Sequence, residues 1–232
     1  MKNHDDQKSI VLCLILLFSF AFFACNRPSV YEIPKSATNL APDQALASGQ
    51  FRLIVDASMI QIRVVKDDHI PVRGTFNLSE GQLVLKSIEN AIGSVLLDIT
   101  SWDSGLSERD AIITKLLLQS EQPGFEKASL DLGVLPKQAV EALIKTKRVD
   151  DVTLDAVLLF KGNRVSLPLK VKMFFDERDR FVVQSVSPSM VTLSALGLKD
   201  LLPEYITQRG IKSISDEVQF TMDLRFGVGS GG

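Results

Sequence analysis

Side chains capable of catalysis are sparse in this sequence. The chain has two histidines: His4 precedes a long apolar run, and His69 follows the charged residues Lys66-Asp67-Asp68. A serine or cysteine nucleophile needs a general base beside it, and a histidine usually supplies that base. Because a histidine in a charged loop is normally solvated, we predict no catalytic residue and no enzymatic activity.

The acidic clusters do not predict a metal site either. Asp176, Glu177 and Asp179 lack the spacing and the glycine of a calcium loop, and no Cys/His cluster has zinc spacing. We expect a solvated turn there. A second charged group, Glu108-Arg109-Asp110, is expected to cap a helix and to pair locally. The sequence therefore predicts no metal and no cofactor.

The N-terminus carries the remaining reactive groups, Cys13 and Cys25. Ile10 to Ala24 is a continuous apolar run, shorter than the ~20 residues needed to span a bilayer, and it has the layout of a secretory signal peptide. Phe22-Phe23-Ala24-Cys25 resembles the lipobox of bacterial lipoproteins, with Phe22 where leucine is usual. The resemblance implies lipidation of Cys25, and two or more acyl chains anchor a protein stably. The alternative is an ordinary signal peptide with a chance cysteine.

These features predict the organisation of the chain. We expect a signal peptide over residues 1–24, a lipid-anchored flexible tether over 25–50, a folded domain over 51–226 and a flexible tail over 227–232. Cleavage before Cys25 would leave one cysteine and no internal disulfide. We expect a periplasmic, membrane-anchored lipoprotein of the cell envelope, and Asn26 after the cysteine favours the outer membrane.

Composition limits the partners. The chain has 232 residues with 26 basic and 28 acidic side chains, so no basic stripe suggests nucleic acid. The length suits one all-β barrel, and the 45% hydrophobic content is enough for a sizeable core. We expect no nucleic-acid partner, and the oligomeric state stays open, a dimer included.

Alternating apolar and polar residues predict strands through most of the domain. The alternation is regular over Val218 to Phe226, and Val152 to Phe160 and Val165 to Met173 predict a hairpin with Gly162-Asn163 as its turn. Eight or more strands with few helices predict a sandwich or a closed barrel.

Interruptions of this pattern predict corners. Phe51 to Val64 changes the phase of its alternation at Asp56-Ala57-Ser58, which suggests a bulge or corner. Val72 to Phe76 and Gln82 to Leu85 predict a second hairpin.

Short helices are predicted at three places. Ser94 to Leu118 predicts a strand, a turn at Asp103-Ser104-Gly105 and a helix capped by Ser107, which we expect to cover the mouth of the sheet. Further helices are predicted from Pro136 to Ile144 and from Lys199 to Ile206.

Five short motifs, in order along Phe51 to Phe226, resemble the YceI-like family. They are Val55-Asp56-Ala57-Ser58, Arg73-Gly74-Thr75-Phe76, Glu108-Arg109-Asp110, Leu167-Pro168 and Leu196-Gly197-Leu198. Ala57 stands where the family usually has a histidine. The family consists of lipocalin-like antiparallel barrels that bind polyisoprenoid-type lipids. The resemblance therefore implies an all-β, antiparallel lipocalin-like β-barrel with one to three short helices.

An eight-stranded barrel is just wide enough to be filled by side chains or to hold one small ligand. The residues expected to point inward and contact a ligand are Ile60, Ile62, Leu96, Phe160, Leu167, Leu169, Phe220 and Met222. We therefore expect an envelope lipoprotein that binds a long apolar ligand, of isoprenoid lipid or quinone type, for sequestration or transport. The alternative is a structural or adaptor lipoprotein with a filled barrel and a protein partner site.

Overall fold

The structure is a computed structural model that describes residues 49–85 and 91–227. The predicted signal peptide, the lipidation site Cys25, the tether up to residue 48 and the tail from residue 228 lie outside the described residues. These assignments stay predictions. Within the described ranges, no helix has the length and hydrophobicity needed to cross a membrane.

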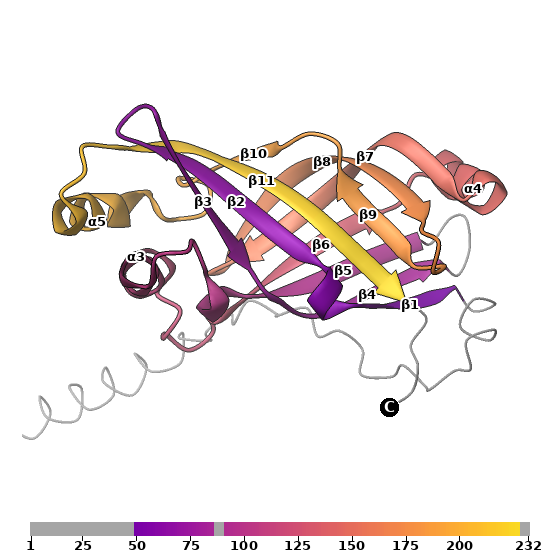
Figure 1. Ribbon diagram of the computed structural model, residues 1–232, viewed down its shortest axis with the longest axis horizontal. Coiled ribbons are helices and arrows are strands. Elements are labelled where there is room, and N and C mark those ends of the chain that lie inside the picture. Colours follow the sequence, from indigo (N-terminus) through magenta and orange to yellow (C-terminus); the bar gives the residue numbers. More distant parts are fainter. Residues whose placement is uncertain (1–48, 86–90, 228–232) are drawn as a thin grey trace, which may run out of the picture. The chain divides into compact units, whose positions relative to one another are not determined.

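Antiparallel strands form one sheet that closes into an eight-stranded barrel (Figure 1). The described part of the sheet has eleven strands, of which eight form the closed circle. The eleven are β1 (Gln50–Leu53), β2 (Met59–Lys66), β3 (Ile70–Phe76), β4 (Leu78–Leu85), β5 (Ala91–Asp98), β6 (Lys127–Val134), β7 (Arg148–Phe160), β8 (Asn163–Phe175), β9 (Phe181–Ser185), β10 (Ser189–Thr192) and β11 (Ile214–Gly227). The order of the eight barrel strands is β1-β4-β5-β6-β7-β8-β9-β11, and β1 pairs with β11 to close the circle. The predicted all-β, antiparallel fold is confirmed.

Strands β2, β3 and β10 lie outside this circle and extend the sheet at one end of the barrel. The long strand β11 pairs with β9 and β10 along one edge, and with β1 and β2 along the other. The phase change predicted between β1 and β2 is a corner formed by the short helix η1 (Val55–Ala57). The Ser58 hydroxyl donates to the carbonyl of Ile54 (2.8 Å) and accepts from the N–H of Arg225 (2.9 Å), which ties the corner to β11.

The predicted hairpin of Val72 to Phe76 with Gln82 to Leu85 is wrong. β3 pairs with β2, whereas β4 pairs with β1 and β5. Between β3 and β4, the N–H of Asn77 donates to the Ser101 hydroxyl (2.8 Å) and its carbonyl accepts from the N–H of Asp98 (2.9 Å). These bonds hold Asn77 beside the end of β5, so the chain continues from β3 into β4 without reversing its direction. β3 and β4 are therefore two parts of one strand that is interrupted at Asn77.

The predicted hairpin of β7 with β8 is confirmed, but its turn is shifted by one residue. Phe160 pairs with Asn163, so the two turn residues are Lys161 and Gly162. Both have positive φ (51° and 80°), as the tight turns that suit twisted hairpins require.

Three short α-helices close the ends of the barrel (Figure 1). Helix α3 (Ser107–Ile112) continues as a π-helix, η3 (Ile113–Leu118), and lies at the same end as η4 (Lys199–Leu201) and α5 (Leu202–Arg209). Helix α4 (Lys137–Thr146) lies at the opposite end. The predicted cap is wrong: the N-cap residue of α3 is Leu106, and no side chain caps it.

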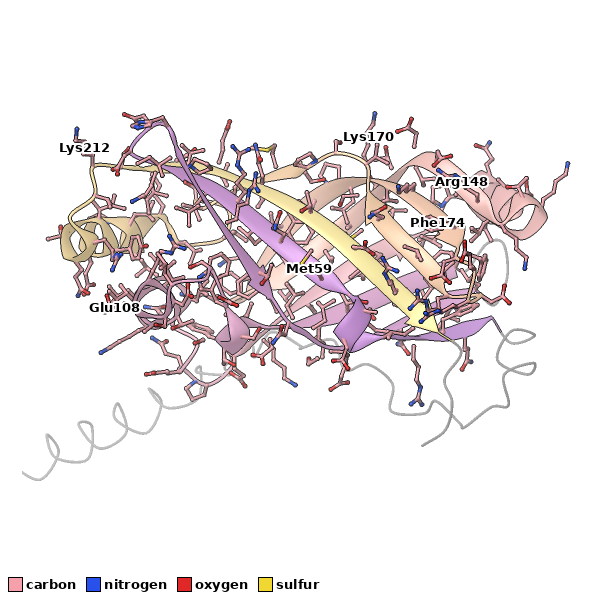
Figure 2. All side chains as sticks on the ribbon, in the orientation of Figure 1. Met59, Glu108, Arg148, Lys170, Phe174 and Lys212 are labelled. Atoms are coloured by element: carbon pink, nitrogen blue, oxygen red, sulfur yellow. The ribbon has the colours of Figure 1, made fainter. Side chains whose placement is uncertain are left out.

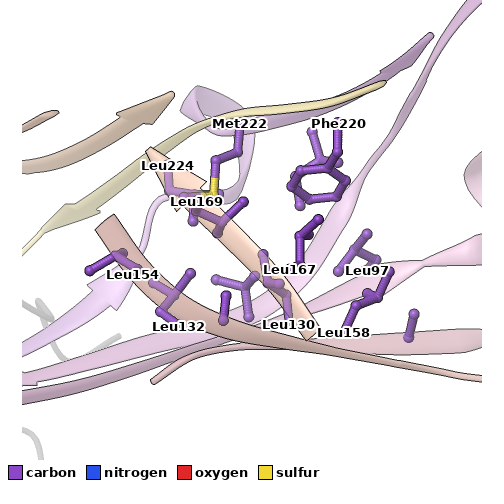
Figure 3. Close-up of a cluster of buried hydrophobic side chains, with 14 of the residues drawn as sticks. Leu97, Leu130, Leu132, Leu154, Leu158, Leu167, Leu169, Phe220, Met222 and Leu224 are labelled. Atoms are coloured by element: carbon purple, nitrogen blue, oxygen red, sulfur yellow. The ribbon is translucent and has the colours of Figure 1, made fainter. Parts of the chain in front are cut away.

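The core fills the half of the barrel beside α4, which we call the closed half. Leu130, Leu154 and Leu169 are fully buried there, and Figure 3 shows them as part of a larger cluster of buried hydrophobic side chains. Next to them, the ring of Phe181 lies 5.4–6.3 Å, centroid to centroid, from three neighbouring rings, those of Phe51, Phe175 and Phe226. Exposed side chains, including Met59, Arg148 and Lys170, cover the outside (Figure 2).

Candidate ligand-binding cavity

A cavity of about 230 Å³ occupies the other half of the barrel, beneath α3, η3 and α5. We call this the hollow half. Strands β2, β3, β5, β6, β7, β10 and β11 all contribute to its wall, and nearly all of the wall is aliphatic or aromatic. An apolar cavity with a few polar groups is the usual form of a small-molecule site.

The cavity exists because the sheet is incomplete at this end. β3 pairs with β2 on one side. On its other side, the described residues form a single β-bridge, in which Thr75 and Asp103 exchange two hydrogen bonds (2.8 and 3.1 Å). Helix α3 and the π-helix η3 take the place of strand pairing, and α5 packs against η3. Ile113 and Leu117 of η3 point their side chains into the cavity.

The corner before α3 is held by Ser104. Its N–H and hydroxyl both donate to the Asp110 carboxylate, and its hydroxyl and carbonyl accept from Nε and Nη2 of Arg109 (2.7 Å each). Arg109 and Asp110 are therefore linked through Ser104, and not by the direct local pairing that the sequence suggested. This network fixes Arg109 at the wall of the cavity.

Trp102 forms part of the same wall. Its ring lies so close to Gly74 that a Cβ there would come within 2.3 Å of it, so the glycine allows the indole to sit against β3. The ring also contacts Phe76, with centroids 4.9 Å apart. Its Nε1–H is buried and has no hydrogen-bond partner among the described residues.

The ionisable groups of the wall are all basic or phenolic. Lys66, Arg109 and Arg209 line the cavity together with Tyr205, and no aspartate or glutamate of residues 49–85 or 91–227 does. Burial raises the pKa of Tyr205, while the nearby Arg209 and Arg109 act in the opposite direction. The Asp110 carboxylate also raises this pKa, so both guanidinium groups and one carboxylate lie in the neighbourhood of the phenol.

The structure separates the ligand-contact residues predicted from sequence into three groups. Ile62, Phe160 and Phe220 line the cavity. Four others are buried in the core without lining it: Ile60, Leu167, Leu169 and Met222. Leu96 is misassigned, because its neighbours Val95 and Leu97 belong to the core and successive side chains of a strand point to opposite faces.

The polar residues Asp98, Asp155 and His69 do not line the cavity. Asp98 accepts hydrogen bonds from the N–H (2.9 Å) and hydroxyl (2.6 Å) of Thr100, so it caps the turn after β5. Asp155 is exposed on β7, and His69 is exposed in the β2–β3 turn. Within residues 49–85 and 91–227, no three His, Cys, Asp or Glu side chains cluster as a metal site would require.

Sequence reasoning missed Trp102, Tyr205 and Arg209, and it assigned Arg109 only a structural role. None of them lies on a strand of regular alternation, so periodicity gave no signal for them. The one usable signal was the single tryptophan of the chain, placed directly before the polar corner.

No family model and no curated protein matches the sequence. Solved structures do match. A polyisoprenoid-binding domain from Saccharophagus degradans, implicated in plant cell wall breakdown, aligns with a TM-score of 0.64 and 16% identity, covering 77% of this chain and 98% of that chain. BcnA from Burkholderia cenocepacia aligns with a TM-score of 0.54 and 15% identity, over 75% of this chain and 98% of that chain. A mutant YCEI protein with a monobromobimane guest aligns with a TM-score of 0.40 and 10% identity, over 65% and 82% of the two chains.

The fold is that of the YceI-like barrels. The resemblance carried by the sequence motifs is confirmed at this level. The YceI-like motif Glu108-Arg109-Asp110 has a physical role here, since two of its three side chains hold the corner that shapes the cavity.

Proposed function

We propose that this protein binds the apolar chain of a lipid-like molecule, of isoprenoid or quinone type, in the hollow half of its barrel and does no chemistry on it. Anchored through Cys25 at a membrane of the envelope, it would sequester or carry that molecule through the aqueous space. The observation that supports this proposal most directly is the apolar cavity beneath α3, η3 and α5.

Two further observations support the proposal. Burial of apolar ligand surface contributes about 25 cal/mol for each Å² removed from water, so such a wall needs no charged contact to bind a hydrocarbon. The polyisoprenoid-binding domain named above has the same fold. The adaptor alternative requires a filled barrel, and the cavity argues against it.

Two alanines provide a matched test. Ala128 on β6 lines the cavity, whereas Ala156 on β7 is fully buried without lining it. We expect the full chain to bind geraniol at one molecule per protein in native mass spectrometry. Ala128→Leu should abolish this binding with little loss of stability, because its side chain enters existing space. Ala156→Leu should destabilise the fold by about 1–3 kcal/mol.

One result of this experiment supports the proposal and another contradicts it. Uptake of geraniol that is lost only in Ala128→Leu supports the proposal. A protein that takes up neither geraniol nor a short-chain quinone, and carries no lipid after purification without detergent, contradicts it.

A further inference from the structure

We infer that the ligand is a single-chain amphiphile with an anionic headgroup and a buried chain of about nine carbon atoms. This inference rests on the proposed function and specifies its ligand. Two independent features carry it: the charge of the cavity wall and the length of the free interior.

The charge of the wall differs from that of the molecule. The whole chain has 26 basic and 28 acidic residues, yet the described residues that line the cavity include three cations and no carboxylate. Lys66, Arg109 and Arg209 are each partly buried, and none forms an ion pair within the part of the chain that the structure describes. The carboxylates nearest to these cations are Asp110, which is linked to Arg109 through Ser104, and Asp67, which lies beside Lys66, but neither lines the cavity. The charges that face the cavity are therefore positive and favour an anion there.

The geometry of Arg109 suits an anionic headgroup. Nε and Nη2 are held by Ser104, which leaves Nη1 without a partner among the described residues and fixes the plane of the guanidinium. Arginine recognises carboxylate and phosphate oxygens through such fixed donors. Arg209 and the hydroxyl of Tyr205 lie nearby on the facing helix α5, so the headgroup would sit between the two covering helices.

The closed half limits the chain. An engineered apolar cavity of about 150 Å³ holds one benzene molecule, so about 230 Å³ has room for roughly nine carbon atoms. Beyond the cavity, Leu130, Leu167 and Leu169 are fully buried against their neighbours. A longer chain would have to displace this core or leave its far end in water.

The headgroup is tested with decanol and decanoate, which share the chain length and differ in charge. We expect the full chain to bind decanoate about tenfold more tightly than decanol, and added salt to reduce this preference. In the double variant Arg109→Gln with Arg209→Gln, the ratio of the decanoate affinity to the decanol affinity should fall to about one. Arg164→Gln, an exposed change on β8, is the matched control and should keep the preference.

Decyl phosphate tests whether the headgroup is a phosphate or a carboxylate. Tighter binding of either decanoate or decyl phosphate than of decanol supports the inference, and the tighter of the two anions identifies the headgroup. Equal binding of decanol and both anions by the unmodified protein overturns the headgroup assignment. Binding of none of the three contradicts the proposed function itself.

The length limit is tested with saturated fatty acids of increasing length. Affinity should rise about fourfold for each added methylene up to about nine or ten carbons and then level off. A rise that continues to tetradecanoate overturns the limit. Decanoate binding shows at the same time that the cavity is intact.

Discussion

The two halves of this barrel are built from the same strands but differ in what they enclose. In the closed half, eight paired strands complete the circle, and leucines and phenylalanines fill it. In the hollow half, β3 is joined to the chain after β5 by one bridge, and helices cover the opening. Completeness of strand pairing, rather than side-chain hydrophobicity, separates core from cavity here.

Leucine truncation gives the largest expected contrast between the halves. Leu169→Ala in the closed half should cost about 3–5 kcal/mol of unfolding free energy, because it creates a new void in a filled core. Leu97→Ala at the cavity should cost about 2 kcal/mol, since part of its surface already faces free space. Urea unfolding measures both. Equal losses would mean that the two halves are equally packed.

Sequence alone predicted the wall of the barrel but not where it is hollow. Alternation of period two identifies which face a side chain points to, so Phe220 and Met222 were both correctly placed inside. It carries no information on depth along the barrel, and only Phe220 reaches the cavity. Depth is set by the break at Asn77 and by the helices, whose contacts are long-range. The prediction for Leu96 was wrong for a simpler reason: its side chain was assigned to the inner face of β5, whereas Val95 and Leu97 occupy that face.

The contact of Gly74 with Trp102 is expected to be specific to the hollow half. Gly74→Ala places a Cβ against the indole and should displace Trp102, at a cost of about 1–3 kcal/mol. Decanoate affinity should fall with it, as measured by calorimetry. A matched change in the closed half, Ala156→Ser, should leave affinity unaltered, and loss of affinity there too would remove the distinction.

The charged turn between β8 and β9 tests the closed half by pH. The Arg180 side chain donates to Asp176 (2.7 Å) and, with the N–H groups of Arg178 and Arg180, lowers the pKa of that carboxyl from 3.8 to about 2 against the opposing effect of burial. The carboxylate is therefore the form favoured by folding. Its contribution is complete above pH 3.8 and is lost as the pH falls toward 2.

Asp176→Asn should accordingly cost about 1 kcal/mol at neutral pH and flatten the pH dependence of stability between about pH 4 and pH 2. Urea midpoints across this range measure the effect. Decanoate affinity at neutral pH should not change, because the turn lies far from the cavity wall. An unchanged pH profile would contradict the assigned hydrogen bonds.

The smallest expected effect concerns the anchor of Arg109. Ser104→Ala removes the hydroxyl that links Arg109 to Asp110 and should cost about 0.5–1.5 kcal/mol. The preference for decanoate over decanol should fall a few-fold, since the guanidinium is no longer fixed. Ser166→Ala, an exposed change on β8, is the control. A full preference in Ser104→Ala would show that the anchor does not position the cation.

The most direct test of the central claim uses the only tryptophan of the chain, Trp102, which lies in the cavity wall. Decanoate carrying bromine near the end of its chain quenches indole fluorescence only at close contact. The account predicts saturable quenching at one molecule per protein, absent in Ala128→Leu and retained in Arg164→Gln. Quenching that never saturates, or that persists in Ala128→Leu, would show that the chain binds elsewhere and would contradict the account.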